Sequence, residues 1–137
     1  MLRFIFVCIV AFGLAACGGA PTAQVTSDSV ISALKAAGLE AEAPTKMAPN
    51  DFGVAPVLCE GTRFLVPSLG PDNGGRVFIC KNADDAAKTK AAYDAMGKES
   101  GLLFSWAFTK GNVVIQINGD MDEAQAKQYE TIINALP

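Results

Sequence analysis

Two stretches of the chain, 36 residues apart, carry the same succession of strand, turn and helix signals. Aligned without gaps, they share six identities over nineteen positions. The identical residues are Gly75, Val77, Ile79, Asn82, Asp84 and Tyr93, which align with Gly111, Val113, Ile115, Asn118, Asp120 and Tyr129. The pattern indicates either a structural repeat or two units that share their chemistry by chance. In both cases it limits the fold to two successive strand–turn–strand–helix units.

Periodicity and turn residues place the individual elements of these units. The sequence predicts strands over 63–67, 76–80, 102–109 and 113–118, and helices over 27–37, 84–97 and 120–136. Ser27, Asp84 and Asp120 are the expected helix caps, and Gly97 is the expected end of the second helix. We therefore expect an α+β fold of two layers, in the order α-β-β-α-β-β-α. Its four-stranded, mainly antiparallel sheet would carry the helices on one face.

Alternation along the strands predicts which side chains face the helices. One face would carry Val77, Ile79, Val113, Ile115 and Ile117, together with Phe104, Trp106 and Phe108 of the neighbouring strand. The other face would carry Phe78, Cys80, Ser105, Ala107, Thr109, Val114 and Gln116. Alternating aromatic residues in a strand favour a core, although an aromatic binding platform is the alternative.

The four cysteines fall into different regions of the chain. Cys8 lies in an apolar N-terminal stretch and Cys17 directly after it, which leaves Cys59 and Cys80 as a pair. In an oxidising compartment a disulfide between them is the default, and it would stabilise the fold by about 3 kcal/mol. Two free thiols or a redox pair are the alternatives, although the pair lacks CxxC spacing. A disulfide would draw the irregular segment 40–61 across the open side of the sheet.

The first 17 residues resemble the signal sequence of bacterial lipoproteins. A short basic start with Arg3 precedes the apolar stretch 4–14, which is shorter than the roughly 20 residues of a spanning helix. The sequence Leu14-Ala15-Ala16-Cys17 then resembles a lipobox, the site of signal peptidase II. The resemblance implies that Cys17 becomes the N-terminal residue and carries diacylglycerol and an acyl chain such as palmitate. The alternative is an ordinary secretory signal.

These signals divide the chain into three parts. We expect a signal peptide at 1–16, a lipidated cysteine with a flexible tether at 17–25, and one globular domain at 26–137. In bacterial lipoproteins an aspartate after the lipidated cysteine is associated with retention in the inner membrane, so by the same resemblance Gly18 favours the periplasmic face of the outer membrane, if the cell has two membranes. Without Arg3 the chain has 10 basic and 14 acidic residues, from the 11 and 14 of the full chain. This acidic balance and the absence of a basic run argue against nucleic acid as a partner.

Few residues offer catalytic or metal-binding chemistry. The chain contains no histidine, which excludes histidine-dependent triads and histidine-ligated metals. Asn118, Asp120 and Asp122 imitate the first three ligands of an EF-hand loop. The imitation ends at Glu123 and Tyr129, where the motif requires glycine and glutamate. Helix capping is therefore the favoured role of these three residues, with calcium as a weak alternative.

The sequence therefore favours a non-enzymatic, lipid-anchored lipoprotein of the cell envelope. Its small α+β domain would present a binding surface to a protein partner in the envelope, with no cofactor. One alternative is a small-ligand binder, or an enzyme based on carboxylates or lysines, with a cleft beneath the 40–62 segment. Another is an inhibitor-like domain that docks into other proteins.

Overall fold

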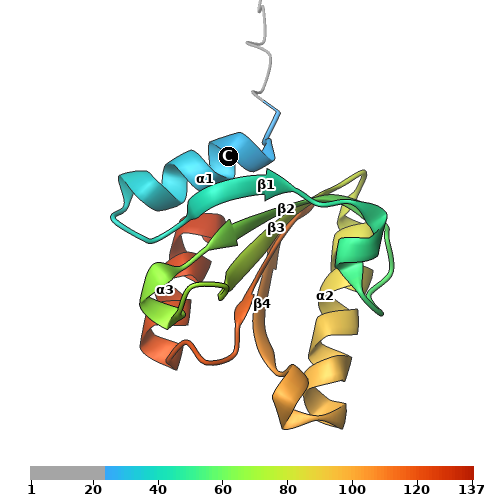
Figure 1. Ribbon diagram of the computed structural model, residues 1–137. Helices are drawn as coiled ribbons and strands as arrows, with labels where there is room; N and C mark the ends of the chain where they lie inside the picture. Colours follow the sequence, from blue (N-terminus) through green and yellow to red (C-terminus); the bar gives the residue numbers. More distant parts are fainter. Residues whose placement is uncertain (1–23) are drawn as a thin grey trace, which may run out of the picture.

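The structure is a computed structural model that describes residues 24–137, so the predicted signal peptide and Cys17 lie outside the described residues. The described part forms three α-helices and a five-stranded sheet (Figure 1). The helices are α1 (Ser27–Ala36), α2 (Ala83–Glu99) and α3 (Glu123–Asn134). The strands are β1 (Glu42–Lys46), β2 (Cys59–Leu65), β3 (Gly74–Cys80), β4 (Ser105–Lys110) and β5 (Val113–Asn118). The α+β class predicted from the sequence is confirmed.

The sheet has the order β1-β2-β3-β5-β4, and every neighbouring pair of strands is antiparallel. It contains one strand more than the predicted four, because β1 forms within the segment that was expected to be irregular. All five residues of β1 are exposed, so the strand has no apolar alternation to reveal it. Ala43, with a φ of 45°, and Pro44 further obscure the pattern.

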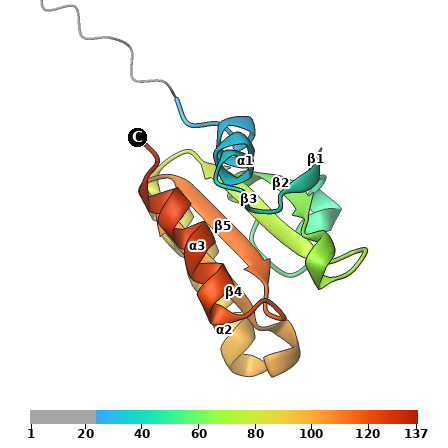
Figure 2. The same ribbon diagram turned by 90° about the vertical axis from the view of Figure 1, so that its left-hand side faces the viewer.

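Helices lie on both faces of the sheet, which corrects the prediction that they share one face. Figures 1 and 2 show α1 and α3 on one side and α2 on the other. Helix α2 connects β3 to β4, which run parallel because each is antiparallel to β5 between them. Such crossovers have a preferred hand, which restricts the connecting helix to one face. Helix α3 follows the last strand and is free of this restriction.

The core between the sheet and helices α1 and α3 contains the alternate strand residues that the sequence predicted. Val77, Ile115 and Ile117 are fully buried there and pack with Ile133 and Tyr129 of α3. Phe108 also belongs to this core, and Ile79 and Trp106 are partly buried against it. The prediction was wrong for Phe104, which precedes β4 and is 42% exposed.

A second core fills the space between the sheet and α2. Phe78 of β3 is fully buried and its ring lies 5.6 Å from that of Tyr93 on α2 and 5.8 Å from that of Phe52. Phe52 ends the short 3-10 helix η1 (Pro49–Phe52). The irregular segment thus reaches this face of the sheet, as predicted, but the face is not open because α2 covers it.

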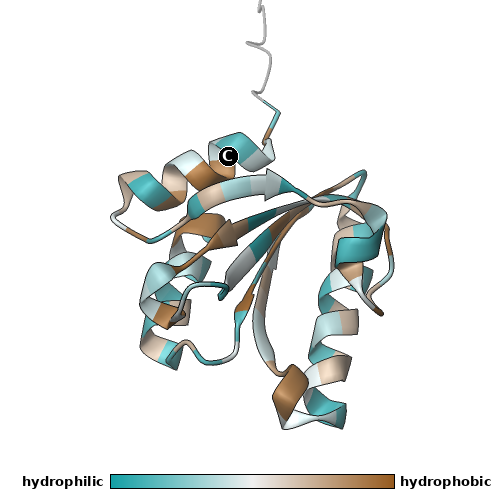
Figure 3. Ribbon diagram, viewed as in Figure 1, coloured by the Kyte–Doolittle hydropathy of each residue, from teal (hydrophilic) through white to brown (hydrophobic). Residues whose placement is uncertain are grey.

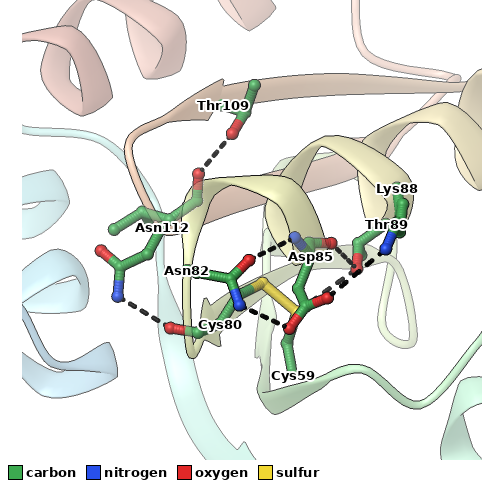
Figure 4. The surroundings of a disulfide bond; sticks show 9 residues. Cys59, Cys80, Asn82, Asp85, Lys88, Thr89, Thr109 and Asn112 are labelled. Carbon is green, nitrogen blue, oxygen red and sulfur yellow. Dashed lines mark hydrogen bonds and ion pairs between the residues drawn. A yellow bond between two sulfur atoms is a disulfide. The ribbon is translucent and has the colours of Figure 1, made fainter.

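A disulfide between Cys59 and Cys80 connects β2 to β3, where the two residues are directly opposite each other (Figure 4). The predicted pairing is thereby confirmed. Both cysteines are buried, and Sγ of Cys59 lies 3.3 Å from Oγ1 of Thr89 on α2. The carbonyl of Cys80 accepts a hydrogen bond from the side chain of Asn112 at 2.9 Å. The bridge therefore fixes the start of β2 beneath the first turns of α2.

The helix ends differ from the predictions by a few residues. Thr26 rather than Ser27 caps α1, in a capping box with Ser29. Asn82 rather than Asp84 caps α2, which passes through Gly97 and ends at Glu99. Ser, Thr, Asn and Asp all cap helices by accepting a hydrogen bond from a backbone N–H. When two such residues lie one or two positions apart, the sequence alone does not show which of them is the cap.

The two strand–turn–strand–helix units are present as β2–β3–α2 and β4–β5–α3. Their strand residues are equivalent, since Val77 and Val113 face the same core. Their helices are not, because the aligned tyrosines lie in opposite cores, Tyr93 on the α2 side and Tyr129 on the α3 side. The similarity in sequence therefore describes two hairpins with matching faces rather than two equivalent structural units.

Candidate functional site

A cleft of about 690 Å³ lies on the α2 side of the sheet. It is bordered by the C-terminal part of α2, the 3-10 helix η3 (Gly101–Leu103) and the segment 51–54 that follows β1. Four polar side chains from four elements line it: Arg76 of β3, Gln116 of β5, Ser105 of β4 and Tyr93 of α2. Residues 51–54 belong to the segment under which the sequence placed a cleft.

Arg76 is the central charged group of this cleft. It is directly opposite Gln116 in the sheet, and its Nη1 donates a hydrogen bond to Oε1 of that residue at 2.7 Å. Its Nε is buried and has no hydrogen-bond partner among the described residues. None of the ion pairs within residues 24–137 involves an arginine. A partly buried guanidinium thus has a neutral amide, and no carboxylate, as its nearest partner.

A second arginine adds to this positive charge. Arg63 of β2 is directly opposite Arg76 on its other side and also lines the cleft. Its Nη2 donates to the backbone carbonyl of Asp72 at 2.5 Å, so this arginine too is paired with a neutral group. Like charges directly opposite in neighbouring strands destabilise a sheet, and an external anion would relieve this repulsion.

Two hydroxyl groups of the cleft, those of Ser105 and Tyr93, add to its polar lining. The hydroxyl of Ser105 is buried without a hydrogen-bond partner in the described part of the chain, and the residue is only 8% exposed. Burial raises the pKa of Tyr93, while the nearby positive charge of Arg76 lowers it by a smaller amount. Tyr93 therefore remains a neutral hydroxyl at physiological pH. Buried polar groups without partners are uncommon, and each is a possible contact for a ligand.

Apolar side chains form the rim of the cleft. Of the five large hydrophobic residues that the structure describes as exposed, four line this cleft. They are Leu102 at 96% exposure, Val54 at 86%, Leu103 at 53% and Phe104 at 42%. In Figure 3 the hydrophobic colour of η3 marks this rim at the lower end of α2. We call the four residues the apolar rim.

Three carboxylates also border the cleft: Asp51, Asp72 and Asp120. All three are exposed, and Asp51 accepts a hydrogen bond from the backbone of Ala48 at 2.7 Å. With Arg63 and Arg76 the lining carries two positive and three negative charges, a sum of −1. The cleft is therefore not generally cationic. Its positive charge is confined to the arginine pair on the sheet, and its negative charge lies at the exposed border.

The weak calcium candidates are used in local structure. Asn118 accepts a hydrogen bond from the backbone of Asp120 at 2.8 Å and donates one to the side chain of Asn73 at 3.0 Å. Asp122, rather than the predicted Asp120, caps α3 by accepting from Gln125 at 2.9 Å. Within residues 24–137, no three acidic, cysteine or histidine side chains converge to hold a metal.

A second hollow, of about 730 Å³, lies where the described chain begins. It is lined by residues 24–28 of the chain start, by residues 57–62 around the start of β2, and by Pro44, Lys46 and 79–81. The unpartnered buried atoms of the described residues belong to the first cleft, not to this one. We therefore regard the cleft at Arg76 as the candidate site.

The 3-10 helix η3, which borders the cleft, and the start of the described chain lie at opposite ends of the molecule. Figures 1 and 2 show the chain start beside α1 at the top and η3 at the bottom, and the two views are turned about the vertical axis. Among the described residues, no helix is both long and apolar enough to cross a membrane.

Sequence reasoning placed Gln116 and Ser105 on the correct face but did not identify Arg76 as a site residue. A signal was present, because Arg76 is a charge inside the otherwise uncharged strand β3. The apolar rim had a weaker signal, because Leu102, Leu103 and Phe104 fall within the strand that the sequence predicts over 102–109. Comparison with known proteins found no matching family model, no matching curated protein and no matching solved structure.

Proposed function

We propose that this chain is a lipid-anchored lipoprotein of the bacterial cell envelope that binds a protein partner without catalysis. The anchor would be a diacylglycerol and an acyl chain on Cys17, a proposal that rests on the lipobox-like sequence Leu14-Ala15-Ala16-Cys17. Two or three acyl chains suffice for stable attachment to a membrane. The periplasmic face of the outer membrane is the favoured location in a cell with two membranes.

One observation supports a binding role above the others: the clustering of exposed hydrophobic side chains at a single cleft. Four of the five exposed large hydrophobic residues of the described chain form the apolar rim. A group of exposed apolar residues bordered by polar ones is typical of a protein interaction site. Helix η3, which carries Leu102 and Leu103 of the rim, is remote from the start of the described chain, which favours a partner in the aqueous compartment over the anchoring membrane.

The anchor is tested by expressing the full chain and its Cys17→Ser variant in bacteria. We expect the wild type in the membrane fraction with an intact mass that includes the acyl groups, and the variant without the acyl groups and with its signal sequence uncleaved at position 17. Recovery of both proteins in the soluble fraction, with no added mass, would refute the anchor.

The binding role is tested by placing a photo-crosslinking amino acid at Leu102 of the anchored protein in cells. The matched control carries the same group at Ser32, an exposed position on α1. We expect a discrete adduct from position 102 that is missing from position 32 and that weakens when Leu103 is changed to Ser. Identical adducts from the two positions, or none from position 102, would contradict docking at the rim.

A further inference from the structure

We propose that the cleft binds the C-terminal carboxylate of a partner polypeptide whose last residue is apolar. This inference deepens the proposed function, since it rests on the cleft being the docking site. It does not depend on the lipid at Cys17. The carboxylate would lie against Arg76, and the last side chain of the partner would lie against the apolar rim.

The first step of the argument is the missing counter-ion of Arg76. A charge that is partly removed from water is costly unless it is paired, and Arg76 has only the amide of Gln116 as a partner. Arg63, directly opposite in β2, increases the cost. An arriving anion would pair with both guanidinium groups in a charge-assisted interaction, which is about twice as strong as a neutral hydrogen bond.

The second step concerns the kind of anion. A carboxylate matches the planar fork of an arginine and accepts additional hydrogen bonds from hydroxyls such as those of Ser105 and Tyr93. The three aspartates at the border oppose any group that carries more than one negative charge. The charge arrangement therefore favours a singly charged carboxylate over a phosphate.

The third step concerns what is attached to the carboxylate. The apolar rim borders the polar floor, so a ligand that fills the cleft needs an apolar group next to its anionic one. Leu102, at 96% exposure, extends beyond the floor, and a small acid bound at Arg76 would leave this side chain uncovered. In a polypeptide, the residues that precede the C-terminal one would extend over Leu102 and cover it. Capture of a terminal carboxylate is a known mode of peptide recognition.

The test uses the mature protein in lipid nanodiscs and the probe peptide acetyl-Ala-Ala-Leu-Phe. The peptide is titrated as the free acid and as the C-terminal amide, with calorimetry and the fluorescence of Trp106 as readouts. Trp106 is the only tryptophan of the chain, and its ring lies 5.0 Å from that of Phe104 in the rim. We expect the free acid to bind at least about tenfold more tightly than the amide, the factor that 1.4 kcal/mol represents.

Three variants separate binding from folding, each checked by its thermal unfolding curve. Arg76→Gln should remove the preference for the free acid, and Lys98→Gln, on the exposed end of α2, should retain it. If Arg76→Gln does not fold, Gln116→Glu replaces it in the test. This variant keeps Arg76 and supplies it with an internal carboxylate. It should therefore abolish the preference as well.

Other outcomes would overturn the inference. Equal affinity of acid and amide would exclude the carboxylate. Octanoate that binds as tightly as the peptide would indicate a site for small acids, and inorganic phosphate that competes at equal concentration would indicate a general anion site. If these results appear while the adduct at position 102 persists, only the ligand assignment fails. If the adduct is also missing, the proposed docking role fails with it.

Discussion

Arg76 and Gln116 are directly opposite each other on β3 and β5, and Nη1 of the arginine donates to Oε1 of the glutamine over 2.7 Å. This contact turns the guanidinium toward an amide that is itself only 5% exposed. The glutamine thus holds the arginine in place without neutralising it. The contact leaves the positive charge of Arg76 unneutralised and available to an external group.

Replacing Gln116 with Glu should stabilise the fold at neutral pH, because the new carboxylate pairs with the positive charge of Arg76. We expect a gain of about 1 kcal/mol in the free energy of unfolding, measured by urea denaturation at pH 7. The gain requires an ionised carboxylate, so it is lost as the pH falls below the ordinary glutamate pKa of about 4.3. A Gln116→Met variant, which adds no charge, should show no such gain, and an equal gain in both variants would contradict the role of charge.

Loss of the disulfide should destabilise the fold more than any single surface change. The double variant Cys59→Ala, Cys80→Ala removes a bridge that closes a loop across 21 positions of the chain. The loop-entropy relation predicts a loss of about 3 kcal/mol in the free energy of unfolding. Urea denaturation of oxidised wild type, reduced wild type and the variant measures it. The reduced wild type should resemble the variant and gain about 2 Da in mass. Unchanged stability in the variant would show that β2 and β3 are held by packing alone.

Tyr129 should make the protein sensitive to alkaline pH. Its hydroxyl donates to the backbone carbonyl of Glu40 at 2.8 Å, and burial raises the pKa of Tyr129 to about 12. The folded pKa exceeds the unfolded value of about 10, so the stabilisation is complete below pH 10 and is lost as the pH rises toward 12. Thermal unfolding between pH 8 and 12 follows the loss, and phenolate absorbance reports the titration.

The matched variant Tyr129→Phe keeps the ring that stacks 6.4 Å from Phe64 but removes the hydroxyl. It should lower the free energy of unfolding by about 1 kcal/mol at pH 7 and reduce the alkaline loss. Some loss will persist, because burial also raises the pKa of Tyr93. An unaltered alkaline profile in the variant would assign the sensitivity to another group.

The turn between β4 and β5 depends on Gly111, whose φ of 56° lies in the left-handed region. Gly111→Ala should destabilise the fold by about 1 kcal/mol, since alanine reaches this conformation only with strain. Gly101→Ala is the matched control, because Gly101 has neither a positive φ nor an atom within 4 Å of an added Cβ. Urea denaturation of both variants separates strain from composition, and equal effects would exclude strain as the cause.

Local chemistry allowed much of the fold to be predicted. Strand alternation placed Val77, Ile115 and Ile117 in one core and Phe78 and Cys80 on the opposite face, as the structure has them. The pair Cys59 and Cys80 could be identified because the other two cysteines belong to the N-terminal region. The faces of a strand follow from its two-residue period, and the cysteine pair follows from the number and positions of the cysteines. Neither inference requires knowledge of distant contacts.

Features without a local period could not be predicted. Strand β1 is exposed along its whole length and exists because the free edge of β2 accepts its hydrogen bonds. Phe104 continues the alternation of Trp106 and Phe108 in the sequence, but it lies outside the sheet because β4 begins only at Ser105. In both cases the hydrogen bonds between strands, rather than the residues themselves, set where a strand starts or ends.

The sequence by itself determined the three α-helices, four of the five strands, the two faces of the central strands and the cysteine pair, because these follow from side-chain periodicity and composition. The tertiary structure alone decided which face α2 covers, and that choice creates the candidate site. Because α2 covers the face of the sheet opposite to α1 and α3, Arg76, Gln116 and Ser105 become the floor of a cleft. Leu102, which follows α2, is brought to its rim. These residues come from separate elements: strand pairing places Arg76 opposite Gln116, and the chain crossover from β3 to β4 brings Leu102 to the same face.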